Sequence, residues 1–363
     1  MRVALEATAA CRPVKTGIAR YATELMRALA KRQDRTDTDD RFDAYYRLSR
    51  RWKADHRPPR IDGIATHWFQ EPVPPILKRH DIVHGLDVRV PRWPRVHRVA
   101  TLHDLFAIVS SEFVPPSLRD KSIRRYREIA ERSHRIIAIS ESTRRDFLGL
   151  FDYPPERVRV VHLGVDPSFR PRAEEELSSM RTRLGLENDY LLYVGDLTPR
   201  KNLARLVRAY ARSKASADFD LAIVGAREFR AAEIERELSS SPCHDRIHRL
   251  GYVDSEDLRL LYAGAAAFLF PTLYEGFGLP VLEAFASGTP VLSSNTSSIP
   301  EIAGGHAVLV DPEDEVAIAE GIDRAIDYSP ERLEAARVHA AQFTWERCAR
   351  HTYAVYEDLI DES

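Results

Sequence analysis

Apolar residues along the chain form short buried runs that alternate with segments of helical spacing, as in parallel β-strands joined by α-helices. In the first half, such runs predict strands at residues 2–6, 44–46, 64–68, 81–84, 99–102, 135–139 and 158–164, with helices at 17–31, 116–133 and 141–150. In the second half they predict strands at 190–195, 220–224, 249–252, 265–270, 290–292 and 307–310, with helices at 202–212, 280–287 and 345–360. The pattern therefore predicts an α/β protein with two doubly wound parallel sheets.

The length of the chain favours two domains, because 363 residues exceed the usual size of a single hydrophobic core. We expect the first domain to cover residues 1–166 and the second to cover residues 167–344. No apolar stretch approaches the length of a membrane-spanning helix, and the first residues lack the apolar core of a signal peptide. Cys11, Cys243 and Cys348 are too few and too scattered for a disulfide framework. We therefore expect a cytoplasmic protein.

Charge is distributed unevenly between the two halves. Residues 1–165 hold 32 Lys and Arg against 21 Asp and Glu, a balance of +11, whereas the rest of the chain has a balance of −13. This asymmetry indicates that one domain faces an anionic partner or surface. The segment from Leu118 to Arg135 carries seven basic residues against three acidic ones. It is either a solvated helix or a contact with the anionic inner leaflet of the cell membrane, where each nearby cation contributes about 1 kcal/mol.

The most informative segment is residues 271–283, which follows the apolar run 265–270. It contains a Gly-Phe-Gly loop, and Pro280 stands where a helix takes its first residue. A glycine loop is thus expected at the carboxyl end of a parallel sheet, where open α/β folds bind ligands. Glycines let main-chain N–H groups approach a ligand closely, and a helix N-terminus favours an anion.

Two carboxylates flank this loop, Glu275 before it and Glu283 in the expected first helical turn. A carboxylate can accept hydrogen bonds from two neighbouring hydroxyl groups, as a ribose or a hexose presents them. The segment therefore predicts a ligand that is anionic and rich in hydroxyl groups. The alternative is an ordinary strand-to-helix loop whose two Glu residues suit a helix N-terminus.

The string Glu275-Gly-Phe-Gly-Leu-Pro, with Glu283 eight positions on, resembles the signature of the retaining family-four glycosyltransferases of GT-B fold. The resemblance implies that Glu275 and the adjacent loop contact the transferred sugar, and that Glu283 holds the ribose of the nucleotide. The loop residues concerned are Gly276, Phe277, Gly278 and Leu279. It further implies two Rossmann-like domains facing a cleft, with helix 345–363 packing back on the first domain.

A second candidate segment is residues 194–202, with Arg200 and Lys201 where a helix is expected to begin. Surface cations usually prefer the opposite end of a helix, so their position indicates a bound anion such as a nucleotide diphosphate. In the resembled family a basic pair here neutralises the leaving diphosphate without a divalent metal, so we expect no metal site and no cofactor. The family often carries Arg directly after the strand glycine, where this chain has Asp196. A solvated basic loop is the alternative.

Further candidates come from the resemblance alone. Gly17 heads a helix, where relatives bring a phosphate or an acceptor close to the backbone. His103 matches a histidine that lines the cleft near the sugar, and Asp104 is expected to orient its imidazole. Tyr252 and Val253 match the segment whose backbone receives the nucleobase. The alternatives are an ordinary helix-start glycine and a structural histidine at a strand end.

Other classes of protein fit the sequence less well. The Asp-x-Asp pairs Asp37/Asp39 and Asp218/Asp220 could hold a metal, but the first lies in a charged loop and the second precedes a strand. A dehydrogenase would need Gly-x-Gly-x-x-Gly after its first strand, and neither half has it. The basic stretches lack the interleaved aromatic residues of a nucleic-acid binder, so we expect no nucleic-acid partner. A sugar-nucleotide-binding protein without transferase activity and a non-transferring GT-B epimerase remain as alternatives.

The expectation is therefore a retaining, metal-independent hexosyltransferase with a nucleotide-sugar donor. The pattern looks most like bacterial polysaccharide mannosyltransferases, which favours GDP-mannose as donor over the alternative, a UDP-sugar. The expected acceptor is a glycan or a polyprenyl-diphosphate-linked glycan. The expected location is cytoplasmic, with peripheral contact at the inner face of the cell membrane.

Overall fold

The computed structural model describes residues 1–11, 16–33, 39–53, 55–71, 79–110, 113–225 and 231–362. The chain divides into two compact units, each of which is described by itself. Unit 1 comprises Met1–Gly164 and Phe343–Ser363, and unit 2 comprises Val165–Gln342. The sequence boundaries proposed above lie two residues further along the chain at both crossings, at 166/167 and 344/345.

Unit 1 is built on a seven-stranded sheet in which all neighbouring strands pair in parallel. The strand order is β3-β2-β1-β4-β5-β6-β7. The strands are β1 (Arg2–Glu6), β2 (Arg41–Arg47), β3 (Ala65–Phe69), β4 (Ile82–Gly85), β5 (His97–Leu102), β6 (Arg135–Ala138) and β7 (Val158–Val160). The helices are α1 (Gly17–Gln33), α2 (Phe106–Val109), α3 (Pro116–Arg132), α4 (Glu141–Leu150) and α13 (Trp345–Asp361).

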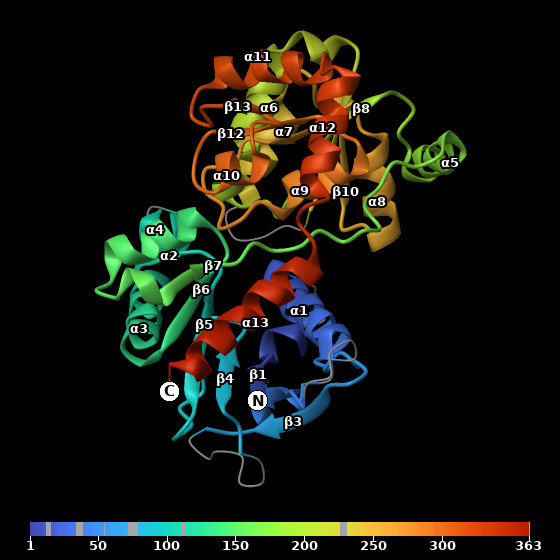
Figure 1. The fold of residues 1–363 in the computed structure, drawn as a ribbon. Coiled ribbons are helices and arrows are strands. Elements are labelled where there is room, and N and C mark those ends of the chain that lie inside the picture. Colours follow the sequence, from blue (N-terminus) through green and yellow to red (C-terminus); the bar gives the residue numbers. More distant parts are fainter. Residues whose placement is uncertain are drawn as a thin grey trace. The chain divides into compact units, whose positions relative to one another are not determined.

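Alternation along β5 separates the two faces of this sheet. Ala100 and Leu102 belong to a buried cluster with residues of α3 and α4. Thr101 between them instead accepts or donates a 2.9 Å hydrogen bond with Tyr21 of α1. On that second face, α1 and the C-terminal helix α13 lie side by side (Figure 1).

A buried polar network fixes α13 to the sheet. His84 Nδ1 lies 2.6 Å from the hydroxyl of Tyr356, and His84 Nε2 lies 2.8 Å from the hydroxyl of Thr101. Burial lowers the pKa of His84 to about 3, so the ring is neutral, with one nitrogen donating and the other accepting. Both nitrogens are thereby satisfied in a fully buried position, and helix 345–361 is an integral part of unit 1.

The connection out of unit 1 passes very close to the start of α13. A Cβ added to Gly164 would lie 2.3 Å from the backbone nitrogen of Trp345 and 2.6 Å from the carbonyl carbon of Thr344. Only glycine allows the two backbone segments this approach.

Unit 2 is built on a six-stranded sheet, also with parallel pairs, in the order β10-β9-β8-β11-β12-β13. The strands are β8 (Tyr190–Val194), β9 (Asp220–Val224), β10 (Ile247–Gly251), β11 (Ala267–Phe270), β12 (Val291–Ser294) and β13 (Val308–Val310). The helices are α5 (Glu174–Leu184), α6 (Leu203–Arg212), α7 (Ala231–Ser240), α8 (Ser255–Gly264), α9 (Leu279–Ser287), α10 (Ile299–Ala303), α11 (Glu315–Ile326) and α12 (Pro330–Ala340). Figure 1 shows α6, α7 and α11 gathered over this sheet.

The core of unit 2 follows from helical spacing. Leu203, Leu206, Val207 and Tyr210 of α6 are fully buried and pack with α11 and the sheet in one cluster. Burying side chains of this size stabilises the unit by about 1.5–3 kcal/mol each relative to exposure. The predicted α/β architecture, with two parallel Rossmann-like sheets, is confirmed.

The basic segment 118–135 divides between two environments. Most of it lies in α3, where Arg119, Lys121, Arg124 and Arg127 are exposed. Arg135 instead belongs to β6, is 8% exposed and forms an ion pair with Glu362. The expectation that Arg135 belongs to an exposed basic surface is therefore wrong, because the sheet buries it. No helix in the described part of the chain is long and apolar enough to cross a membrane.

Candidate functional site

The glycine loop of unit 2 runs from the buried strand β11 to helix α9. Gly278 caps α9 with φ of 107°, and a Cβ there would lie 2.9 Å from Cδ1 of Ile299. Any side chain at this position would be strained and would collide with Ile299. The helix begins at Leu279, so Pro280 is its second residue and not its first. Glu283 is consequently the fifth helical residue, and its expected place in the first turn is wrong by one position.

The two cations lie in a 3₁₀ turn, Pro199–Lys201, that precedes α6. Asn202 follows it with φ of 59°, the left-handed conformation that Asn tolerates better than most residues. Its side-chain Nδ2 donates to the carbonyls of Pro271 (2.8 Å) and Pro312 (2.7 Å). Asn202 therefore turns the chain and ties the cation-bearing turn to the end of β11.

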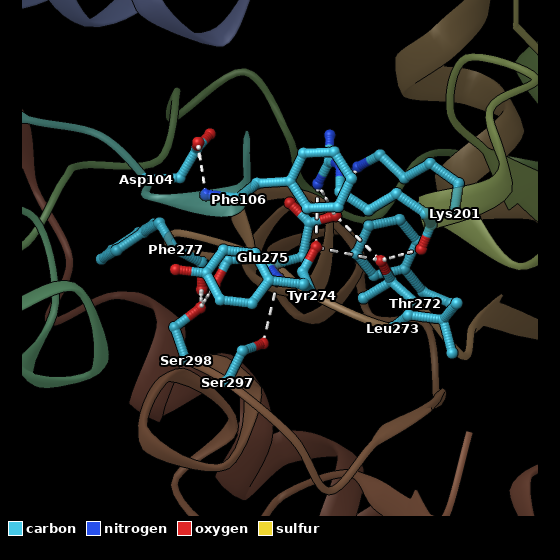
Figure 2. A network of polar contacts seen from close by, with 12 residues as sticks. Asp104, Phe106, Lys201, Thr272, Leu273, Tyr274, Glu275, Phe277, Ser297 and Ser298 are labelled. Carbon is cyan, nitrogen blue, oxygen red and sulfur yellow. Dashed lines mark hydrogen bonds and ion pairs between the residues drawn. The ribbon is translucent and has the colours of Figure 1, made fainter. Parts of the chain in front are cut away.

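Both cations form ion pairs with the first carboxylate of the glycine loop. Figure 2 shows Lys201, Thr272 and Glu275 in this cluster. Glu275 Oε1 accepts from Arg200 Nη1 at 2.9 Å and from Lys201 Nζ at 2.6 Å. The hydroxyl of Thr272 donates to the same oxygen at 3.1 Å. Lys201 Nζ also lies 4.6 Å from the centre of the Phe270 ring. Residues 200 and 275, distant in the sequence, thus form one charged cluster.

Burial and charge act in opposite directions on this cluster. Burial alone would raise the pKa of Glu275, but Arg200 and Lys201 outweigh it, and the net pKa is lowered. Burial lowers the pKa of Lys201, while Glu275 opposes that shift and Arg200 adds to it. We take Glu275 to be ionised at neutral pH, because two cations share its Oε1. With two positive charges to one negative, the cluster can attract an anion.

The turn after β12 holds the loop from the other side. Glu275 donates its backbone N–H to the Ser297 hydroxyl at 3.0 Å. The Ser298 hydroxyl lies 2.9 Å from the Glu275 carbonyl and 2.8 Å from the Phe277 carbonyl, and it donates to them (Figure 2). These contacts fix the backbone of the Gly-Phe-Gly loop, so that a ligand meets a preformed surface.

The remaining residues expected in the second domain lie at the same sheet edge. Tyr252 and Val253 follow β10, and Tyr252 is 76% exposed. Strands β9 and β8 separate β10 from β11, and three strand spacings amount to about 14 Å. Glu283 is 5% exposed and lies on α9 behind the loop. An extended ligand is required to contact both Tyr252 and Glu275.

The expected residues of the first domain belong to unit 1. Gly17 is the exposed first residue of α1, and nothing lies within 4 Å of a Cβ built on it. His103 follows β5, is 6% exposed, and donates from Nε2 to the Leu86 carbonyl at 2.9 Å. Burial lowers its pKa, so the ring is neutral. Asp104 was expected to orient this ring, but its carboxylate accepts from the Phe106 N–H at 3.2 Å, and the ring is oriented by Leu86.

Sequence reasoning missed the polar residues that hold the site together: Asn202, Thr272, Ser297 and Ser298. Asn directly after the basic pair was a usable signal, because Asn often adopts the left-handed conformation. The serines gave no such signal, since their partners lie more than twenty residues away.

Glu6 is another buried carboxylate, and the sequence did not single it out. It ends β1, is 2% exposed, and its Oε1 lies 3.3 Å from Arg47 Nε and 2.5 Å from the Thr8 hydroxyl. Burial raises its pKa to about 7, although Arg47 and Thr8 act in the opposite direction.

This raised pKa predicts a pH-dependent stability. Folded Glu6 binds a proton more tightly than unfolded Glu6, so its stabilising contribution is complete below about pH 4.5 and is lost as the pH rises through 7. Glu6→Gln should therefore raise the free energy of unfolding at pH 8, by at most about 3 kcal/mol at ~1.4 kcal/mol per pKa unit, and change it little at pH 4.5. The measurement is urea unfolding followed by tryptophan fluorescence, since Trp52, Trp68, Trp93 and Trp345 all belong to unit 1. The exposed Glu131→Gln is the control, and an equal gain at both pH values contradicts the prediction.

The Asp-x-Asp alternative finds no support among the described residues. Asp220 is 3% exposed at the start of β9 and accepts from His248 at 2.7 Å, at the end of the sheet away from the glycine loop. Asp37 lies outside the described residues. Within the described ranges, no group of three or more His, Cys, Asp or Glu side chains is arranged to hold a metal ion.

Both units of the chain match known families of glycosyltransferases. Residues 176–341 match the family described as "Glycosyl transferases group 1", and residues 15–169 match "Glycosyltransferase Family 4". O-antigen chain mannosyltransferase B of Escherichia coli is 32% identical over 285 residues, which cover 77% of this chain and 74% of the relative. Serotype-specific mannosyltransferase WbdA of Escherichia coli is 27% identical over 276 residues. These residues cover 73% of this chain but only 34% of WbdA. MMP alpha-(1->4)-mannosyltransferase of Mycolicibacterium hassiacum is 31% identical, over 64% of this chain and 56% of the relative.

Solved structures share the fold at lower identity. Sucrose-phosphate synthase from Thermosynechococcus elongatus superposes with a TM-score of 0.79 at 21% identity, over 100% of both chains. Anabaena HepE, solved in complex with UDP and glucose, gives a TM-score of 0.74 at 16% identity, over 99% of this chain and 100% of the other. These two comparisons establish the fold alone. Through the sequence matches, the chain belongs to the group 1, family 4 glycosyltransferases of GT-B fold, and it is a glycosyltransferase.

Proposed function

We propose that this glycosyltransferase is a retaining mannosyltransferase. It transfers mannose from GDP-mannose to a glycan or a polyprenyl-diphosphate-linked glycan in bacterial polysaccharide synthesis. The observation that carries the proposal is the 32% identity to O-antigen chain mannosyltransferase B over 77% of this chain. WbdA and the MMP mannosyltransferase, whose names also specify mannosyl transfer, support the same sugar.

In the proposed complex, unit 2 holds the donor. The diphosphate lies against Arg200, Lys201 and the first-turn N–H groups of α9, which attract negative charge. Glu283 accepts from the ribose hydroxyls, and the backbone at Tyr252 and Val253 receives the base. Glu275 accepts from a hydroxyl of the mannose, with the Gly276–Leu279 backbone beside it.

The proposed chemistry is the breaking of the bond between the anomeric carbon and the diphosphate oxygen. Negative charge grows on the diphosphate as this bond breaks, so cations already fixed beside it stabilise the transition state more than the bound donor. No metal or other cofactor is part of the proposal, because the basic pair supplies the positive charge. The acceptor hydroxyl attacks the anomeric carbon from the same face that the diphosphate leaves, so the anomeric configuration is retained. The proton of this hydroxyl passes to an oxygen of the leaving phosphate.

Donor choice and stereochemistry can be tested together. Thermal stabilisation by GDP-mannose, by UDP-glucose and by the matching free nucleotides identifies the donor. Nuclear magnetic resonance of the first-formed product identifies the anomer. The proposal expects stabilisation by GDP-mannose and an α-linked product. Stabilisation by UDP-glucose alone would establish the UDP-sugar alternative, and a β-linked product would exclude retention.

Glu283→Ala should weaken nucleotide binding in particular. A charged acceptor for the ribose hydroxyls contributes roughly 1.5–3 kcal/mol per hydrogen bond, or about 10- to 100-fold in Kd. Calorimetric titration with GDP measures the change, and the exposed Glu320→Ala on α11 is the control in the same unit. Glu275→Ala should reduce turnover more than GDP affinity, because its proposed partner is the sugar. Equal GDP affinity in wild type and Glu283→Ala would remove Glu283 from the ribose site.

Peripheral contact with an anionic membrane is the last part of the proposal. The exposed α3 cations Arg119, Lys121, Arg124 and Arg127 should each contribute about 1 kcal/mol near such a surface, an attraction that fades with salt. We expect the protein to sediment with anionic vesicles at low salt, and Lys121→Gln/Arg124→Gln to reduce the bound fraction. Equal sedimentation with anionic and neutral vesicles at low salt would favour an acceptor free in solution.

A further inference from the structure

Unit 1 contains a cavity whose lining is dominated by arginine. It has a volume of about 410 Å³, within the usual range of small-molecule sites. Its charged lining consists of five arginines and two glutamates: Arg47, Arg89, Arg92, Arg125, Arg132, Glu71 and Glu128. The lining side chains have a surplus of three positive charges, and Glu6, which is not part of the lining, lies 3.3 Å from Arg47 Nε. None of the seven lining side chains belongs to the glycine-loop site of unit 2.

The two glutamates are already paired with three of the arginines. Glu71 Oε2 lies 3.1 Å from Arg47 Nη1. Glu128 Oε1 lies 2.7 Å from Arg92 Nη2 and 3.5 Å from Arg132 Nε. The carboxylates thus hold the guanidinium groups of the cavity wall in place.

Arg89 and Arg125 differ from these three. Both are half-buried, and neither forms an ion pair with any residue that the structure describes. Burial lowers the pKa of Arg89, the nearby charges of Arg125 and Arg47 add to that shift, and the carboxylates of Asp87 and Glu6 oppose it without cancelling it. Like charges held together in a half-buried cavity repel one another, and a bound anion relieves that repulsion. The guanidinium fork matches phosphate oxygens, and no lysine lines the cavity.

A neighbouring cavity leaves room for an occupant larger than one phosphate. This second cavity, of about 440 Å³, shares Arg47 and Glu71 with the first. Its lining includes Trp52, a side chain that is 80% exposed and therefore open to a ligand. A ligand anchored by its anionic group in the first cavity has room to continue along this wall.

We propose that the arginine cavity of unit 1 binds a phosphate or diphosphate group of a larger ligand, with Arg89 and Arg125 as its principal contacts. The occupant is then the diphosphate of the acceptor, an assignment that rests on the proposed function. The binding site itself does not depend on that function, because it is defined by the cavity alone.

The test uses inorganic pyrophosphate and the full chain. Lys201→Ala serves as the parent, because it weakens the anion site of unit 2. We expect the parent to bind pyrophosphate in calorimetry, and Arg89→Gln/Arg125→Gln added to it to weaken binding by roughly tenfold or more, since two charge-assisted contacts are lost. Lys121→Gln/Arg124→Gln removes the same charge from exposed positions of α3 and should leave the affinity nearly unchanged. Arg125→Gln alone should give an intermediate loss, and it replaces the double variant if that does not fold.

Two results overturn the proposal: no pyrophosphate binding by the parent, or equal losses in the two double variants. Farnesyl diphosphate, titrated in parallel, identifies the source of the anionic group. Tighter binding than pyrophosphate, lost in Arg89→Gln/Arg125→Gln, assigns the cavity to a lipid-linked diphosphate. Equal affinities, lost in the same variant, assign it to a diphosphate without a lipid. Neither titration measures sugar transfer, so the result stands even if the donor proves not to be GDP-mannose.

Discussion

Lys201→Ala is expected to lower kcat/KM by about 100- to 1000-fold, the usual loss when one preorganised contact to developing charge is removed. Lys201 is one of two cations on Glu275 Oε1, at 2.6 Å, and it is proposed to neutralise the leaving diphosphate. Its loss should also weaken GDP binding. Initial rates of donor hydrolysis and of mannosyl transfer are the measurements.

Lys201→Met provides the matched variant, since it keeps an unbranched apolar stem near the Phe270 ring but lacks the charge. It should be as inactive as Lys201→Ala, which would assign the loss to charge and not to packing. Wild-type activity should also survive EDTA. An EDTA-sensitive activity restored by Mn²⁺, or a Lys201→Met rate within threefold of wild type, would contradict the proposed role of the basic pair.

Gly164→Ala should destabilise unit 1 by about 3 kcal/mol, at the upper end of the range for overpacking. Its new Cβ would lie 2.3 Å from the Trp345 backbone nitrogen and 2.6 Å from the Thr344 carbonyl carbon. Backbone atoms cannot move aside as a flexible side chain can, so the start of α13 must shift. Urea unfolding, followed by the four tryptophans of unit 1, measures the effect.

The control is the same substitution at Gly149 in α4. Nothing lies within 4 Å of a Cβ at Gly149, so Gly149→Ala should stabilise the helix by about 0.5–1 kcal/mol. Opposite signs for the two variants are expected. Equal effects would show that the close approach at Gly164 does not limit stability.

Local pattern predicted the fold well, because buried parallel strands leave a strong apolar signal. The strand at 2–6 and the strand at 220–224 have the predicted bounds, and the other strands differ by a few residues. Short helices such as α10 were not predicted individually, since five residues carry too little periodicity.

The candidate site was predicted only in part, because local spacing identifies single residues but not their contacts with distant segments. Spacing identified Glu275, Lys201 and the glycine loop, but the shared oxygen of Glu275 depends on the pairing of β8 with β11, which no local pattern encodes. The contact of Ser298 with the Glu275 carbonyl has the same origin. Arg135 shows that local charge can also mislead. It was counted with its basic neighbours of segment 118–135, but it lies in β6 and is buried there.

The contact between Gly164 and the start of α13 brings together the two points at which the chain crosses between the units. The chain leaves unit 1 at residue 164 and returns to it at residue 343, and these two points adjoin through the 164–345 contact. Unit 2 is therefore an insertion at one position of unit 1, an arrangement that domain insertions in proteins commonly have. A short glycine linker in place of residues 165–342 should leave unit 1 with a continuous sheet and its own core. Grafting another relative's second unit at the same junction would then test whether the choice of donor, which we propose to lie in unit 2, is exchanged with that unit.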